Sequence, residues 1–178
     1  MKIAILLSTY NGAKYLDEQL RSIAAQETTN DICVYVRDDG STDGTIDILE
    51  GWKEKINIKI YAENNVGPAK SFWALLNKDI DADFYMFSDQ DDIWDSDKVE
   101  KSIAVLNSNV CLSACNCRII DAKGDILKYK RLEQIPNFNL QSLFVSGFTQ
   151  GCSMAITREL RDYIVASNIK CVPMHDII

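Results

Sequence analysis

The chain has no apolar run long enough to span a bilayer, although 47% of its 178 residues are hydrophobic. It also has no excess of positive charge, because it contains 26 acidic and 19 basic residues and its net charge is −7. Broad binding to a nucleic-acid backbone needs a basic stripe, so we expect no nucleic-acid partner. A nucleotide ligand stays compatible with this charge, because a divalent cation can bridge carboxylates to phosphates.

A regular cysteine framework is also missing. The six cysteines stand in apolar surroundings, which is typical of a reducing cytoplasm. Cys111, Cys115 and Cys117 would share one face of a strand, but a zinc site needs closer pairs and a fourth ligand, so we expect them to pack in the core. The start of the chain lacks a full signal-peptide core and a cleavage site, and we interpret it as a first strand.

Strand and helix patterns alternate four times over about the first hundred residues. Each short apolar run is followed by apolar residues at helical spacing. This order predicts the α/β class, with parallel strands and helices on both faces of the sheet. The four predicted strands are Lys2–Ser8, Ile32–Arg37, Ile58–Ala62 and Phe84–Ser88. Asp97 and Glu100 are spaced as a capping box for the fourth helix.

The pattern loosens after the fourth helix. Val110–Ile120 predicts one long strand, and Ile126–Lys130 is expected to return as its hairpin partner. A short strand at Ser153–Thr157 and a helix over Arg158–Ser167 follow. The length of the chain and the absence of a convincing linker favour a single domain.

Two acidic clusters follow two of the predicted strands. Asp38-Asp39 follows the second strand, and Asp89-Gln90-Asp91-Asp92 follows the fourth. Ligands of open α/β sheets bind at this edge, where massed carboxylates repel one another unless a cation or hydrogen-bond donors hold them. An Asp-x-Asp step could hold a divalent cation with a diphosphate, and a carboxylate of the first cluster could accept the imide N–H of uracil or thymine. Each cluster is also compatible with an ordinary turn that caps the next helix.

Four segments together resemble the family 2 glycosyltransferases. They stand in the order found in that family: Ser8–Gly12, Asp38–Asp43, Asn65–Gly67 and Ser88–Trp94. Two further segments look like acceptor-side motifs of the rhamnosyltransferase-like branch, namely Gln150–Met154 and His175-Asp176. The resemblance implies a GT-A fold, in which a mostly parallel nucleotide-binding sheet flanked by helices joins a smaller C-terminal acceptor-side part.

The resemblance also implies an organisation and an activity. One catalytic domain, 1–178, would have a nucleotide-sugar-binding half at 1–108 and an acceptor-side half at 109–178. The second half is expected to be truncated, because the chain stops two residues after Asp176. The implied enzyme is an inverting, metal-dependent hexosyltransferase that moves a sugar from a nucleotide diphosphate donor, with dTDP-rhamnose or a UDP-sugar suggested. The acceptor would be a glycan or lipid-linked glycan in cell-surface polysaccharide synthesis, and we expect a cytoplasmic location, including the inner face of the membrane.

Site roles follow from the same resemblance, motif by motif. Ser8 and Tyr10 would contact the nucleoside, and Asp39 would bind the base. Asp89 would lie near the ribose, and Asp91 would hold Mg²⁺ or Mn²⁺ as the cofactor. Asp176 would be the general base that deprotonates the acceptor hydroxyl.

Other functional classes fit parts of the pattern. A sugar-nucleotide pyrophosphorylase would carry a glycine-rich, basic phosphate loop after its first strand, where this chain has Ser8–Gly12. A phosphatase with an Asp-x-Asp nucleophile would carry its acidic loop after the first strand rather than the fourth. A non-catalytic module that kept the donor site stays open as a third alternative.

Overall fold

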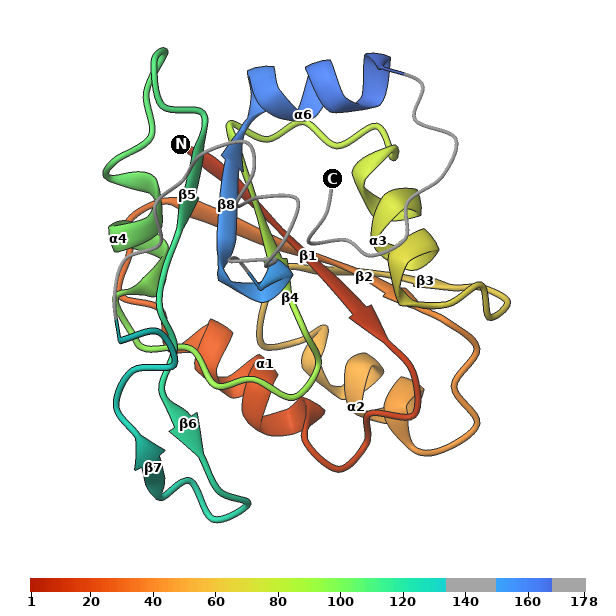
Figure 1. Ribbon diagram of the computed structural model, residues 1–178. Coiled ribbons are helices and arrows are strands. Elements are labelled where there is room, and N and C mark those ends of the chain that lie inside the picture. Colours follow the sequence, from red (N-terminus) through yellow and green to blue (C-terminus); the bar gives the residue numbers. More distant parts are fainter. Residues whose placement is uncertain (134–149, 168–178) are drawn as a thin grey trace.

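The computed structural model describes residues 1–133 and 150–167. Within them the chain forms a six-stranded sheet, covered by helices on both faces, and a separate two-stranded hairpin (Figure 1). The elements in chain order are β1 Lys2–Thr9, α1 Leu16–Ala24, β2 Asp31–Asp38, α2 Thr45–Trp52, β3 Ile58–Ala62, α3 Pro68–Leu76, β4 Phe84–Ser88, α4 Lys98–Ile103, β5 Leu112–Ala114, β6 Ile119–Ile120, β7 Ile126–Lys128, η1 Gly151–Ser153, β8 Met154–Thr157 and α6 Arg158–Ala166.

The main sheet has the strand order β3-β2-β1-β4-β8-β5. The first four of these strands are parallel, and β8 runs antiparallel to both β4 and β5. The central strands β1 and β4 are almost continuously apolar, as expected for strands that are buried on both faces. The α/β alternation and the four strands predicted from the sequence are therefore confirmed.

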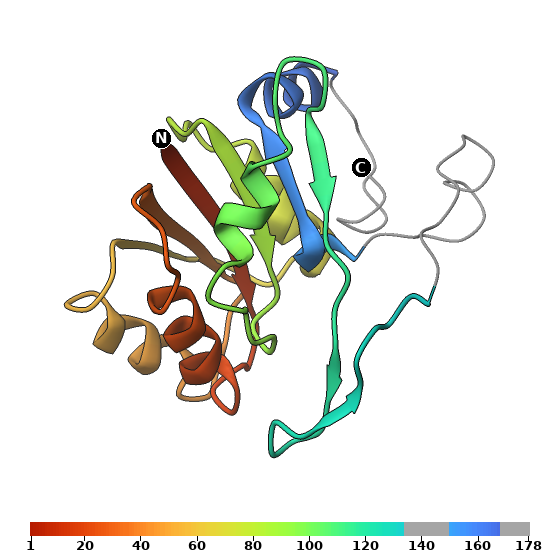
Figure 2. The same cartoon turned by 90° about the vertical axis from the view of Figure 1, so that its left-hand side faces the viewer.

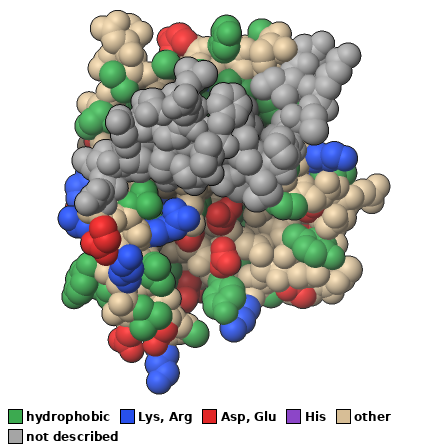
Figure 3. Space-filling view, viewed as in Figure 1, with side chains coloured by type: hydrophobic (Ala, Val, Ile, Leu, Met, Phe, Trp, Pro, Cys, Tyr) green, Lys and Arg blue, Asp and Glu red, His purple; other side chains and the backbone are tan. Residues whose placement is uncertain are grey.

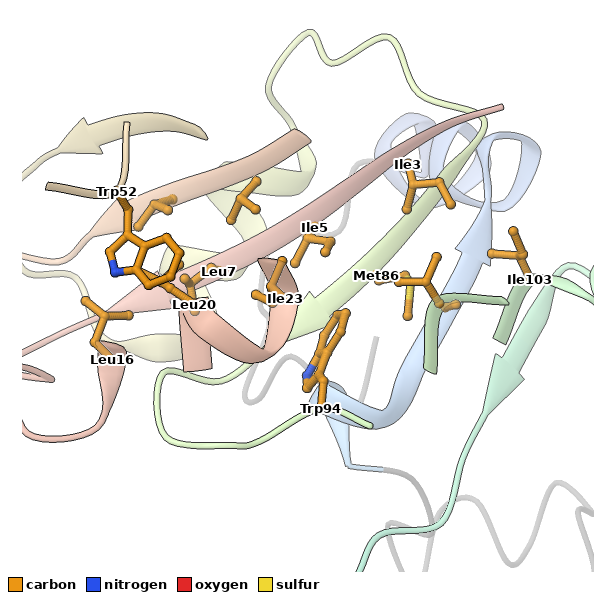
Figure 4. Close-up of a cluster of buried hydrophobic side chains, with 14 of the residues drawn as sticks. Ile3, Ile5, Leu7, Leu16, Leu20, Ile23, Trp52, Met86, Trp94 and Ile103 are labelled. Carbon is orange, nitrogen blue, oxygen red and sulfur yellow. The ribbon is translucent and has the colours of Figure 1, made fainter. Parts of the chain in front are cut away.

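Alternation along β1 divides the core into two layers. Ile3, Ile5 and Leu7 face α1, α2 and α4, whereas Ala4 and Leu6 face α3 and α6. Figure 4 shows the first layer, in which two tryptophans pack against the helices and the sheet. Its labelled members beyond β1 are Leu16, Leu20, Ile23, Trp52, Met86, Trp94 and Ile103. The second tryptophan in that list follows the acidic loop after β4, so core packing anchors this loop.

The prediction of one long strand over Val110–Ile120 is wrong. Only Leu112–Ala114 pairs with the main sheet, because its partner β8 has only four residues and begins directly after the 3₁₀ turn η1. The chain then leaves the sheet, and Ile119–Ile120 pairs with Ile126–Lys128 in an antiparallel hairpin. Figure 2 shows this hairpin extending away from the sheet.

The cysteines of this region do not pack in the core as predicted. Cys111 and Cys115 are exposed, and Cys117 is only partly buried. The reason is positional, because β5 is the edge strand of the sheet and the chain beyond it belongs to the projecting hairpin.

The predicted capping box of α4 is also wrong. Asp97 stands at the N-cap, but its side chain makes no capping hydrogen bond and instead pairs with Lys101 at 2.6 Å. Glu100 accepts hydrogen bonds from Thr28 and from Asn30, the latter at 2.8 Å. Asp97 thus pairs one turn further along its own helix, and Glu100 bonds to the segment just before β2, so the capping box does not form. The division of the domain near residue 108 stays a prediction, although strands from both halves share one sheet.

Candidate functional site

Three loops meet at the carboxyl edge of the parallel strands. Thr9 at the end of β1 lies opposite Asp38 at the end of β2, and Leu7 lies opposite Ser88 at the end of β4. The segments that follow these strands therefore begin side by side. They include both acidic clusters and the Tyr10-Asn11-Gly12 turn. This is the edge at which open α/β sheets bind ligands.

Side chains tie the loop after β1 to the loop after β4. The Gln90 carboxamide accepts from Tyr10 N at 2.8 Å and donates to Tyr10 O at 3.2 Å. The loop after β2 is tied to the same turn, because Asn11 N donates to Ser41 Oγ at 2.9 Å and Asn11 Oδ1 accepts from Thr42 N at 2.9 Å. Asn11 adopts the left-handed region at φ 48° to do so. The three loops form one hydrogen-bonded unit.

Gly12 is required by this unit, which leads to a first prediction. A Cβ at position 12 would overlap the carboxamide of Gln90. We expect Gly12→Ala to lower the free energy of unfolding by about 1–2 kcal/mol, because overpacking forces Gln90 out of its bonds to Tyr10. In a Gln90→Ala background the same change should be neutral or slightly stabilising. Denaturant unfolding of the four proteins gives the coupling energy, and equal effects of Gly12→Ala in both backgrounds would contradict this reading.

The two aspartates at the end of β2 are buried and fully engaged with the protein. The Asp38 carboxylate accepts from Thr9 Oγ1 at 2.8 Å and from Ser41 N at 2.8 Å. The Asp39 carboxylate, 3% exposed, is paired with Arg37 and accepts from the N–H groups of Val66 at 2.8 Å and Gly67 at 2.9 Å. Burial opposes ionisation of Asp39, but these donors outweigh it and lower its pKa.

Arg37 is the centre of a neighbouring group of polar contacts. Its side chain is 3% exposed and bonds to Asp39, to Glu63 at 3.1 Å and to the Asn64 carbonyl at 2.9 Å. It thus joins the end of β2 to the loop after β3. A cavity of about 620 Å³ opens beside it, lined by Arg37, Asp38, Gly40, Ser41, Ile46, Ala62, Glu63, Asn64 and Val66. The predicted base ligand Asp39 is thus held by three donors next to this cavity, and its contact with a base stays a prediction.

The acidic loop after β4 meets a distant part of the chain. One carboxylate oxygen each from Asp89 and Asp92 and the thiol of Cys152 lie within 4.8 Å of one another. The thiol is brought there by β8, which runs antiparallel beside β4 and places the turn η1 next to the acidic loop. Asp91 is exposed and lies outside this group. Figure 3 shows acidic side chains in the middle of this face, with Lys and Arg side chains beside them.

The carboxylate oxygens of Asp89 and Asp92 are ligand atoms that suit a hard divalent cation rather than a soft one. Carboxylate oxygens are the ligands that Mg²⁺ prefers, with further positions left for water and phosphate. Burial, followed by the charges of Asp92 and Asp89, raises the pKa of Cys152, so its thiol stays protonated at neutral pH. A neutral thiol is a poor ligand, because metals bind the thiolate. A cation here would be held by aspartates.

Two side chains, buried Gln19 and partly buried Lys98, lie next to the acidic loop. The amide of Gln19 lies between Ser88 Oγ, at 2.6 Å, and the indole of Trp94, and in the orientation that satisfies both it also donates to Asp92 O. Lys98 donates to Cys152 O at 2.7 Å, and its Nζ lies 3.9 Å from the centroid of the Trp94 ring. Burial lowers the pKa of Lys98.

The remaining predicted site residues are placed as follows. Ser8 is half-buried at the end of β1, and its hydroxyl donates to Ser71 Oγ at 2.6 Å. Tyr10 is 50% exposed, with its backbone held by Gln90. Asp89 is partly buried in the cluster with Cys152. Asp176 lies outside the described residues.

Sequence reasoning missed Lys98, Gln19 and the position of Cys152. Cys152 belongs to the Gln150–Met154 segment, which the resemblance assigned to the acceptor side without a contact. No local signal links Lys98 or Gln19 to the acidic loop. Both lie on helices, where their sequence positions are typical of ordinary polar residues.

The profile described as "Glycosyl transferase family 2" matches residues 4–162. The chain belongs to glycosyltransferase family 2. It is 39% identical over 117 residues to dTDP-rhamnosyl transferase RfbG of Shigella flexneri. This match covers 61% of this chain and 40% of that protein. It is 33% identical over 112 residues to poly(ribitol-phosphate) beta-N-acetylglucosaminyltransferase TarS of Staphylococcus aureus (strain MW2). This second match covers 61% of this chain and 19% of that protein.

Two solved structures share the fold of this chain. The TarS 1–349 complex with UDP-GlcNAc superposes with a TM-score of 0.67 at 25% identity, covering 92% of this chain and 47% of that one. The mannosyltransferase PcManGT from Pyrobaculum calidifontis, in complex with GDP-Man and Mn²⁺, superposes with a TM-score of 0.68 at 21% identity. The match covers 91% of this chain and 46% of that one. The predicted GT-A fold, with a mostly parallel sheet flanked by helices, is confirmed.

The family membership contradicts the pyrophosphorylase and phosphatase alternatives. This family 2 chain spans less than half the length of either curated relative named above. Among residues 1–133 and 150–167, no helix combines the length and apolar character that a membrane span requires.

Proposed function

We propose that the chain forms the donor-binding core of an inverting glycosyltransferase that moves a sugar from a nucleotide diphosphate to a glycan acceptor in polysaccharide synthesis. The observation that carries the proposal is the junction at the sheet edge. There, Asp89 and Asp92 gather beside the turn Gly151–Ser153, and Gln90 ties their loop to the turn at Tyr10. A nucleotide diphosphate could lie across these loops, with its phosphates toward the aspartates.

The donor we propose is dTDP-rhamnose or a UDP-sugar. The names of two relatives, a dTDP-rhamnosyl transferase and an N-acetylglucosaminyltransferase, support these classes, as does the UDP-GlcNAc complex of TarS. In this proposal Ser8 and Tyr10 contact the nucleoside and Asp39 binds the base. The exposed ring of Tyr10 is free to stack on it.

Asp91 is the proposed ligand of Mg²⁺ or Mn²⁺, and Asp89 lies near the ribose. A divalent cation would stabilise the charge that develops on the departing diphosphate. The exposure of Asp91 supports its role, because a ligand shared with a donor must face the open side of the loop. The carboxylate of Asp92, like that of Asp89, lies within 4.8 Å of the Cys152 thiol in η1.

Asp176 is the proposed general base. It comes from a different part of the chain than the metal loop, as inversion requires, because the base must act on the opposite face of the sugar. Its carboxylate would take the proton of the acceptor hydroxyl as that oxygen attacks the anomeric carbon.

Nucleotide-dependent stabilisation tests the donor proposal. We expect UDP or dTDP with Mn²⁺ to raise the melting temperature, with smaller shifts for GDP and CMP. A ligand at 100 times its Kd adds about 2.7 kcal/mol to the stability. No shift with any nucleotide would overturn the proposal.

The role of Asp91 gives a second prediction. Asp91→Asn should abolish the Mn²⁺-dependent part of UDP or dTDP binding, because a neutral amide is a much poorer ligand for a hard cation. Isothermal titration with and without Mn²⁺ measures this. Asp125→Asn is the matched control, since Asp125 is an exposed aspartate in the hairpin turn. Unchanged Mn²⁺-dependent affinity in Asp91→Asn would remove Asp91 from the site.

A further inference from the structure

A row of polar side chains connects α1 to the chain that follows β4, and no step proposed above uses it. Gln19 and Ser22 are buried on one face of α1, and Gln26 lies just beyond the end of that helix, at the spacing that continues the face. Ser22 Oγ accepts from Trp94 N at 3.0 Å, and Gln26 donates to Asp95 O at 2.7 Å. Burying polar side chains costs free energy unless they find such partners.

Gln19 is the innermost member of this row, with 0% of its surface exposed. With its carboxamide oriented to satisfy every neighbour, its oxygen accepts from Ser88 Oγ at 2.6 Å and from Trp94 Nε1 at 3.3 Å, and its nitrogen donates to Asp92 O. Ser88 is the last residue of β4, and Trp94 is the residue at which the chain re-enters the core (Figure 4). One buried side chain therefore bridges the beginning, the middle and the end of the acidic loop.

The proposed cation ligand, Asp91, lies between two residues that are held in this way. On one side, the Gln90 carboxamide bonds to the backbone of Tyr10 at 2.8 Å and 3.2 Å. On the other side, the carbonyl of Asp92 accepts from Gln19. The backbone on either side of an exposed carboxylate is thus held from two directions. A loop that is ordered before its ligand arrives pays less entropy on binding.

We propose that Gln19 is a positioning residue that holds the acidic loop in the conformation that presents Asp91 to a divalent cation. This inference rests on the proposed function, because it concerns the same cation and the same diphosphate. Gln19 contacts neither ligand and acts through the carbonyl of Asp92. Its loss frees the middle of the loop, so the cation must order the loop as it binds, and it binds more weakly.

The consequence is confined to the part of nucleotide binding that needs the cation. The proposed nucleoside contacts lie on the loops after β1 and β2, whereas Gln19 bonds to the end of β4 and the loop after it. A change at Gln19 should therefore leave UDP affinity without Mn²⁺ near that of wild type. The ratio of the UDP affinities with and without Mn²⁺ should fall. A glutamine that only supported the fold would lower stability on removal and leave this ratio unchanged.

Isothermal titration of UDP with and without Mn²⁺ measures this ratio. Gln19→Met keeps the length of the side chain and removes its hydrogen-bonding groups, so we expect the ratio to fall about three- to tenfold, the factor for one hydrogen bond. Gln26→Met is the matched control, because Gln26 bonds beyond the acidic residues, to Asp95 O and, at 3.0 Å, to Val99 N. This control should lower stability and leave the ratio unchanged.

The outcomes separate this inference from the proposed function. An unchanged ratio in folded Gln19→Met would overturn the inference and leave the proposed function standing. An equal fall in both variants would also overturn it, because the loop would then depend on general packing along α1. If UDP binding to wild type gains nothing from Mn²⁺, the proposed cation site fails, and this inference fails with it. Circular dichroism establishes that each variant is folded, and should Gln19→Met not fold, Gln19→Asn, one methylene shorter, makes the same comparison.

Discussion

Replacing Arg37 by Met should lower the free energy of unfolding by about 3–5 kcal/mol, the cost of leaving a buried charge without its partner. Arg37 and Asp39 are each 3% exposed, and the guanidinium also bonds to the Asn64 carbonyl at 2.9 Å. Met retains most of the apolar stem, so the loss reports the charge and its hydrogen bonds rather than a cavity. The end of β2 and the loop after β3 should loosen together.

The pH dependence of this effect has a definite sign. In wild type the donors hold the pKa of Asp39 below its ordinary value. Its contribution to stability is therefore fully present above the unfolded-state pKa and is lost as the pH falls through the lower folded-state pKa. In Arg37→Met, burial should dominate and raise that pKa. The variant's deficit should then be largest near neutral pH and shrink on acidification, because Asp39 takes up a proton.

Denaturant unfolding of wild type and variant at two pH values measures both effects. Arg21→Met is the control, because Arg21 and Asp17 form an exposed helical pair with side chains 70% and 47% exposed, and such pairs contribute little. A second substitution, Asp39→Asn, should recover part of the loss in Arg37→Met. An Arg37→Met deficit below about 1 kcal/mol, or one that grows on acidification, would contradict this account.

Asp176→Asn should lower the rate of sugar transfer about 10²–10⁴-fold in a full-length transferase that carries this chain, the range for general-base catalysis. The reason is that an amide cannot take the proton of the acceptor hydroxyl. Binding of nucleotide and Mn²⁺ should be unchanged, since the loops after β1, β2 and β4 build the proposed donor site. The prediction rests on the family motif at His175-Asp176.

Steady-state transfer at saturating donor, with nucleotide affinity measured in parallel, decides the role of Asp176. Asp125→Asn again serves as the control for loss of an exposed carboxylate. A wild-type rate in Asp176→Asn would mean that another group is the base. A loss of nucleotide affinity in the variant would instead indicate a structural role for the segment around this residue.

Local patterns in the sequence predicted the alternating first half of the fold. Strands such as Lys2–Thr9 and Phe84–Ser88 are nearly continuous apolar runs, and the helices after them carry apolar residues at helical spacing. Both signals depend only on neighbours within a few positions, so they can be read without coordinates. The order of motifs from Ser8–Gly12 to Ser88–Trp94 also identified the family, because their combination is far more specific than any one of them.

The tertiary structure alone decided what surrounds the acidic loop. Cys152 comes from a distant stretch of sequence, and it meets Asp89 and Asp92 only because β8 pairs antiparallel with β4. On its other side β8 pairs with β5, and because β8 has only four residues the expected long strand is shortened to Leu112–Ala114. Long-range contacts with Thr28 and Asn30 also took Glu100 from its predicted capping box. Local spacing carries no information on such pairings, because the strand order of a sheet is set by packing of the whole chain.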